Sequence, residues 1–215
     1  MSCIRIRKAA VIAALAGAAT MFAVAASATA PEGFFELKNR VEYTLAEVPD
    51  AEREATLKAL AEEMNTLAEQ HPDNAEVLVW QGLVLAAYAG ERRSFGALGD
   101  AKAARRALER AIKLDPKGNN GSAYVTLGIL YARVPGGLIS FGDSEKADRM
   151  FQRALEIRPD GIDVNYYYAT ILADEDRTQA AREHARRAVN GTPRPARQDS
   201  DEALREDARS LLDTL

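Results

Sequence analysis

Side chains able to carry acid–base, nucleophilic or metal chemistry are few in this 215-residue sequence and lie far apart. The two histidines, His71 and His184, have no carboxylate or second imidazole at metal-ligand spacing, and His184, among charged residues, is expected on a solvated helix face. The one cysteine is Cys3, and no basic residue is placed to activate Ser94 or Ser140. We therefore predict a protein that is not an enzyme, with no catalytic residues, no cofactor and no metal.

The first 28 residues have the features of a secretory signal peptide. Three basic residues precede an apolar run over 9–26, and the small residues ASATA (26–30) supply a cleavage site. Cleavage is expected after Ala28, because a cut after Ala30 would leave Pro31 as the first residue. The alternative is an uncleaved anchor, since the run is about long enough to span a bilayer. We favour cleavage and expect a periplasmic or secreted protein without stable membrane insertion.

The charge of the chain excludes several kinds of partner. There are 28 Lys and Arg residues against 32 Asp and Glu residues, and three of the basic ones lie in the predicted signal. The mature protein is therefore more acidic than the full chain. Such a balance does not suit binding to nucleic acid or to an anionic membrane surface.

A recurring pattern of small and large residues organises the rest of the chain. The segments ERAIKLDP (109–116), QRALEIRPD (152–160) and RRAVNGTP (186–193) each place an alanine five residues before a proline. Small residues allow two helices to approach closely, and the larger ones fill the adjoining holes. A proline ends the second helix of each unit. The sequence therefore predicts stacked helical hairpins.

This pattern resembles the tetratricopeptide repeat. The resemblance is carried by Tyr124-x2-Leu127-Gly128-x2-Tyr131, followed by Ala147, Phe151, Ala154 and Pro159. A less regular copy opens at Trp80-x2-Leu83, with Val84 and Ala87 at the next positions, and another opens at Asn165. The resemblance implies an all-α fold: a tetratricopeptide-like helical-hairpin solenoid with long inter-helix loops in two repeats and a C-terminal capping helix.

We expect helices near 34–47, 51–70, 75–89, 100–114, 121–133, 144–157, 161–173, 177–190 and 200–214. The expected units are a signal peptide (1–28), a degenerate opening helical pair (29–74), three repeats (75–118, 119–160 and 161–193), and a linker with a capping helix (194–215). Asp199, Ser200 and Glu202 form a capping-box pattern at the start of the last helix. That helix is expected to cover the last repeat.

Two successive repeats carry extra residues between their helices, in YAGERRSFGALGD (88–100) and RVPGGLISFGD (133–143). Each segment contains Ser-Phe-Gly and ends in Gly-Asp, which is expected to begin the second helix. Matching positions in a stack point the same way, so the loops should be neighbours. They either fold back onto the array or wall a cleft. We hypothesise that Phe95 and Phe141 anchor one apolar lip at the mouth of a groove.

In the tetratricopeptide family the groove lies on the inner face of the first helices. Carried over to this sequence, that face predicts eight binding residues: Gln81, Leu85, Tyr88, Val125, Ile129, Arg133, Tyr166 and Thr170. The Lys and Asn residues of a carboxylate clamp are missing from these positions. The predicted groove is mostly apolar and aromatic.

Two functions stay open at this point. The first is an adaptor that binds a protein or peptide segment through the groove. The second is a ligand-handling accessory in which the two loops close a hydrophobic pocket around a small apolar ligand. The Gly-rich loops and PDGIDVNYYYATIL (159–172) also resemble the T component of TRAP-type solute uptake systems. That family works beside a periplasmic solute receptor, so the resemblance implies a periplasmic transport component as a partner.

Overall fold

The computed structural model describes residues 30–92 and 96–215, and within them the chain is all-helical, without strands. The helices are α1 (Phe34–Glu47), α2 (Asp50–Gln70), α3 (Ala75–Glu91), α4 (Ala97–Leu114), α5 (Ser122–Arg133), α6 (Ser144–Ile157), α7 (Ile162–Asp174), α8 (Thr178–Asn190), a short 3-10 helix η1 (Pro195–Arg197) and α9 (Gln198–Thr214). The all-α prediction is confirmed, and the expected bounds differ by at most three residues, at the start of α4. The predicted signal peptide lies outside the described residues.

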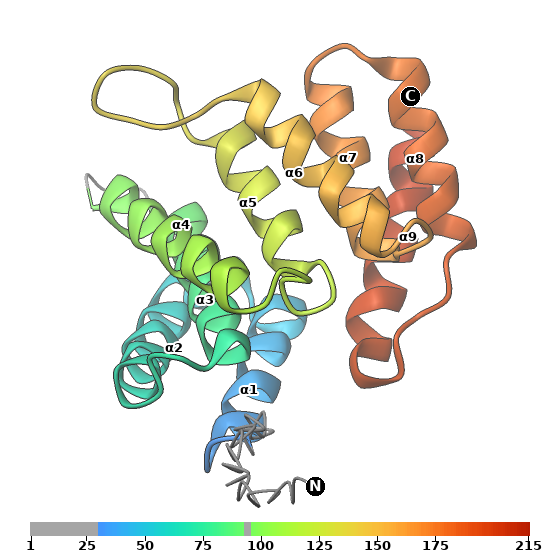
Figure 1. The fold of residues 1–215 in the computed structure, drawn as a ribbon. Helices are drawn as coiled ribbons and strands as arrows, with labels where there is room; N and C mark the ends of the chain where they lie inside the picture. The colour runs from blue at the N-terminus through green and yellow to red at the C-terminus, as the bar shows by residue number, and fades with distance from the viewer. Residues whose placement is uncertain (1–29, 93–95) are drawn as a thin grey trace, which may run out of the picture.

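Consecutive helices pair as antiparallel hairpins, which stack in chain order (Figure 1). One small residue in the first helix of a hairpin receives a large side chain from the second. A Cβ atom on Gly128 would lie 2.8 Å from Cε2 of Phe151, and one on Gly82 would lie 2.4 Å from Cγ of Leu108. The hairpins are therefore held together at these two glycines by close helix approach.

The contact at Gly82 corrects the predicted register of the first repeat. Gly82 occupies the place that Gly128 holds in the next repeat, so the positions assigned to Trp80 and Leu83 belong to Leu78 and Gln81, two residues earlier. The error arose because α3 and α4 have 17 and 18 residues, whereas α5 and α6 have 12 and 14. The residue spacing of one repeat therefore does not transfer to the other.

The same lengthening corrects the first of the two predicted loops. Helix α3 continues to Glu91 and α4 begins at Ala97, so 88–91 and 97–100 of this segment are helical and Gly99-Asp100 lies inside the first turn of α4. Phe95 lies outside the described residues. The second segment is a true loop, and Asp143 begins α6 as expected, with its Oδ1 accepting a hydrogen bond from the Lys146 amide at 2.9 Å.

The C-terminal segment folds back to the first helix. Nε of Arg197 lies 2.8 Å from Oε1 of Glu42 on α1, and the Arg197 guanidinium lies 5.6 Å from the ring of Trp80 on α3. The predicted capping box is wrong, because α9 continues from η1 and begins at Gln198. As expected, α9 covers the last hairpin, with Ala208 buried against Ile162 and Ala188.

A buried carboxylate, Asp163 at the start of α7, ties this segment to the hairpins. It is 5% exposed and pairs with Arg158 at 2.8 Å and with Arg194 at 3.2 Å. Arg194 also binds Asp201 on α9 at 2.6 Å. Burial by itself would raise the pKa of Asp163, but the two arginines hold that pKa below its usual range.

The corrected register predicts opposite effects for two glycine substitutions. Gly82→Ala should lower the free energy of unfolding by about 1–3 kcal/mol, because its Cβ atom would overlap Leu108. Gly99→Ala is the matched control, since no atom lies within 4 Å of its Cβ position and alanine favours the helix by roughly 0.5–1 kcal/mol. Chemical denaturation measures both values. Equal stability of the two variants would show that the register is wrong.

The Asp163 network predicts how stability depends on pH. Because the pKa of Asp163 is lowered in the folded protein, its contribution is present above about pH 4, the pKa range of an unfolded aspartate, and is lost as the pH falls through the folded-state pKa. Asp163→Asn should cost about 3–5 kcal/mol at neutral pH, because it leaves the buried arginines without their partner. It should also flatten the acid side of the stability curve.

Urea denaturation between acid and neutral pH measures both effects of Asp163→Asn. The control is Asp160→Asn, which changes an exposed residue on the preceding turn. Parallel curves for the two variants would contradict a structural role for the ion pairs of Asp163.

Candidate binding pocket

A pocket of about 770 Å³ lies between the inner faces of α3, α5 and α7. This volume is within the range of ordinary small-molecule sites. The pocket follows α5 along its whole length, from Ser122 to Pro135 just beyond its end. The remaining lining residues are Leu45 of α1, Leu83, Ala86, Ala87, Ala89 and Gly90 of α3, Ala97, Leu98 and Ala101 of α4, Val125, Thr126, Ile129, Leu130 and Arg133 of α5, Val134, Asp163 and Tyr167 of α7, and Arg197.

Small side chains on α3 and α4 leave the space that forms the pocket. Ala86, Ala87 and Gly90 of α3 line one side, while Val125 and Ile129 of α5 line the other. These residues recur every three or four positions, so each helix presents one continuous apolar face to the cavity. The walls are therefore apolar over most of their length.

Three of the polar lining residues lie together at one end of the pocket. Asp163 and Tyr167 come from the first two turns of α7, and Arg197 reaches the same end from η1. Burial, followed by the nearby Asp163 carboxylate, raises the pKa of the Tyr167 hydroxyl to about 12. The hydroxyl therefore keeps its proton at neutral pH and can donate a hydrogen bond.

The opposite end of the pocket is more exposed to solvent. Pro135, just after α5, is exposed. Arg133 lies at this end, where its guanidinium is 3.5 Å from the Asp174 carboxylate. The pocket thus has an open mouth, edged by Pro135 and the Arg133–Asp174 ion pair, and a closed end lined by Asp163, Tyr167 and Arg197.

Three of the predicted binding residues, Val125, Ile129 and Arg133, line this pocket. The three predicted on α3 do not, because of the register error described above. Gln81 donates a hydrogen bond to Asn65 of α2 at 2.9 Å, and Leu85 and Tyr88 are buried in the core. The residues that the prediction missed on α3 are Leu83, Ala86, Ala87, Ala89 and Gly90. Recognition of Gly82 as the counterpart of Gly128 would have identified Leu83 and Ala87, the counterparts of Ile129 and Arg133.

On α7 the structure places the predicted pair beside the pocket rather than in its lining. Tyr166 packs with Ile162 and Ala208, toward α9. Thr170 donates a hydrogen bond to the Tyr167 carbonyl at 2.8 Å. Tyr167 and Asp163 face the pocket instead, because α9 covers the neighbouring face of α7. The consecutive tyrosines gave no signal in the sequence to distinguish Tyr166 from Tyr167.

In the loop after α5, one large apolar residue packs onto the protein and two others face solvent. The Phe141 ring packs edge-on against Tyr131 at 5.8 Å and lies 4.5 Å from the Arg105 guanidinium, so it covers α4 and α5 outside the pocket lining. Leu138 and Ile139 are 106% and 80% exposed. Figure 1 shows this loop as an arch beyond the start of α4.

The hypothesised lip is only partly present in the described residues. The ends of the two inserted segments line the same pocket, through Ala97 and Leu98 and through Val134 and Pro135. Phe141 lies away from this point, and Phe95 is outside the described residues. Binding by these residues stays a prediction.

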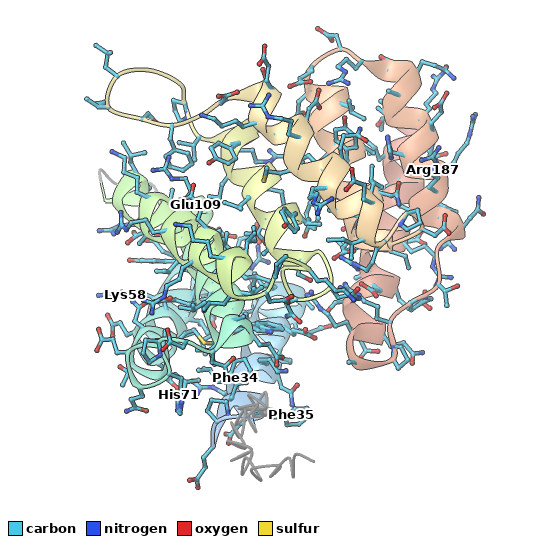
Figure 2. The ribbon with its side chains drawn as sticks, viewed as in Figure 1. Phe34, Phe35, Lys58, His71, Glu109 and Arg187 are labelled. Atoms are coloured by element: carbon cyan, nitrogen blue, oxygen red, sulfur yellow. The ribbon has the colours of Figure 1, made fainter. Side chains whose placement is uncertain are left out.

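Side chains elsewhere in the described chain do not form a second chemical site. His184 is half-buried, contrary to expectation, with Nδ1 2.8 Å from Oδ1 of Asn165 and its ring 4.7 Å from that of Tyr168. Burial lowers its pKa, assisted by Arg187, which lies on the outer side of α8 (Figure 2). In residues 30–92 and 96–215 no three His, Cys, Asp or Glu side chains are grouped to hold a metal ion. Over the same residues, no helix has the length and apolarity needed to cross a membrane.

Comparison with known proteins places this architecture in a family. The sequence model of the TRAP transporter T-component family matches residues 38–207, which include every helix that lines the pocket. No curated protein matches the chain. The helical hairpins agree with the tetratricopeptide resemblance, while membership of the tetratricopeptide repeat family itself stays a prediction. The match spans most of the sequence, and the chain therefore belongs to the TRAP transporter T-component family.

Proposed function

We propose that the protein is a non-enzymatic, ligand-handling accessory of a TRAP-type solute uptake system and works in the periplasm. The observation that carries this proposal is the pocket of about 770 Å³, with its apolar walls and closed polar end. Membership of the T-component family supports an association with a TRAP-type system, and the pocket supports binding of a small molecule. The predicted signal peptide agrees with a periplasmic location.

The chemistry of the walls favours a small apolar ligand over a protein segment. An extended peptide would bring an amide N–H and a carbonyl into the pocket at every residue. The middle of the pocket, between Leu83 and Ile129, offers these groups almost no hydrogen-bond partners. Buried peptide groups without partners are costly, whereas an apolar molecule loses nothing in the same place.

A second surface is suited to the protein partner of such a system. Leu138 and Ile139 project from the loop after α5, and the loop is held by Lys102, whose Nζ donates a hydrogen bond to the Ile139 carbonyl at 2.6 Å. The packed Phe141 ring anchors the other side of the tip. Exposed apolar residues on an anchored loop are typical of protein contacts. We assign this tip to contact with the solute receptor of the same uptake system.

Filling the pocket should weaken ligand binding without unfolding the protein. We expect Ala87→Phe to lower the affinity for N-phenyl-1-naphthylamine, a neutral apolar fluorophore, by at least about 10-fold, because the ring would occupy the cavity. Fluorescence titration measures the affinity. Ala59→Phe, on an exposed position of α2, is the control and should bind as the wild type does. If the fluorophore fails to bind the wild type, or binds Ala87→Phe equally well, the proposed function is wrong.

Polar substitution at the loop tip should weaken binding to the solute receptor and should not change ligand binding in the pocket. The double variant Leu138→Ser and Ile139→Ser should weaken binding to the solute receptor by at least about 10-fold, as expected when apolar contact residues are lost. Its melting temperature and fluorophore binding should not change. Leu114→Ser, at an exposed apolar position at the end of α4, is the matched control. Equal receptor binding by both variants, measured by calorimetry, would contradict the assignment.

A further inference from the structure

The closed end of the pocket contains hydrogen-bond donors that no protein group uses. Within the described part of the chain, no residue accepts a hydrogen bond from the Tyr167 hydroxyl, although Tyr167 lines the pocket. The Arg197 guanidinium also donates no hydrogen bond to a described residue, and its Nε, although 2.8 Å from Oε1 of Glu42, is buried without a hydrogen-bond partner. These donors belong to residues that already lie in the lining. A ligand in the pocket would meet them directly.

The acceptors at the same end are already occupied. Asp163 accepts hydrogen bonds from Arg158 at 2.9 Å and from the Val164 amide at 2.8 Å, and it lies 3.2 Å from Arg194. Glu42 lies 2.8 Å from Arg197. A ligand group that can only donate hydrogen bonds would find no free partner here. A ligand group that accepts hydrogen bonds would find two donor side chains, those of Tyr167 and Arg197.

We propose that this end of the pocket binds the carboxylate of an apolar monocarboxylate, with Tyr167 and Arg197 as its donors and the apolar chain directed along α5 toward Pro135. The proposal rests on the proposed function, because it specifies the ligand of the same pocket. The guanidinium fork of Arg197 matches the two oxygens of a carboxylate. The walls between Leu83 and Ile129 match the chain. Tyr167 and Arg197 are then the residues that determine ligand specificity.

The tyrosines of α7 provide a matched pair of variants. Tyr167→Phe removes a hydroxyl that faces the pocket and makes no described hydrogen bond within the protein, so folding should be preserved. Tyr166→Phe removes the same atom from the neighbouring residue, which packs toward α9. The two variants differ only in which hydroxyl is lost.

The experiment is a titration of the mature protein with decanoate and with decylamine. Calorimetry gives the affinity, and fluorescence of Trp80, the one tryptophan in the sequence, reports on the closed end because its ring lies 5.6 Å from the Arg197 guanidinium. Decanoate should bind the wild type at least about 10-fold more tightly than decylamine and should change Trp80 fluorescence. Tyr167→Phe should weaken decanoate binding by about 10-fold or more, as for the loss of one hydrogen bond to a charged group. Tyr166→Phe should bind as the wild type does.

The possible failures distinguish this proposal from the proposed function. If N-phenyl-1-naphthylamine binds but decanoate does not displace it, or if decylamine binds as tightly as decanoate, the carboxylate assignment is overturned and the pocket keeps its function. Equal decanoate binding by the two tyrosine variants overturns the role of Tyr167. If neither the fluorophore nor decanoate binds, the proposed function fails, and the carboxylate site fails with it.

Discussion

The buried ion pairs of Asp163 are the interaction on which the shape of this molecule depends. Asp163 begins α7, and its two arginine partners come from the end of α6 and from the segment that leads to α9. Arg194 also pairs with Asp201, so the same ion-pair network includes α9. With these residues fixed, η1 is directed so that Arg197 reaches Glu42 and closes one end of the pocket. A charge cluster that would be costly without its partners thus determines where the cavity ends.

Close helix packing explains why a cavity can exist in so small a protein. Gly82 and Gly128 bring the two helices of their hairpins together and make each hairpin rigid. The inner faces of α3 and α4 then carry small side chains, such as Ala87 and Ala101, where a larger residue would have filled the gap. Small residues therefore act in two ways here. Between the helices of a hairpin they give close contact, and between hairpins they leave space.

Apolar residues at the surface follow a similar division of roles. Phe34 is buried at the start of α1 while its neighbour Phe35 is 71% exposed (Figure 2). In the loop after α5, Phe141 packs onto the protein while Leu138 and Ile139 face solvent. The loop is therefore both a structural plug and an exposed apolar tip. Fold-back onto the array applies to Phe141, whereas Leu138 and Ile139 remain exposed.

The sequence by itself determined the helices and most of their bounds, because the spacing of small and large residues, the prolines and the capping Asp143 act within one or two turns of the chain. It also identified Val125, Ile129 and Arg133, since the Tyr124–Tyr131 segment fixes the register of α5 without reference to any distant residue.

The tertiary structure alone decided the register of α3, the exposure of Tyr167 to the pocket, and the closure of the polar end by Arg197. Each of these depends on contacts between distant segments: Gly82 with Leu108, α7 with α9, and Arg197 with Glu42. No periodicity records such contacts, because it describes which face of a helix is apolar and not which element will cover that face.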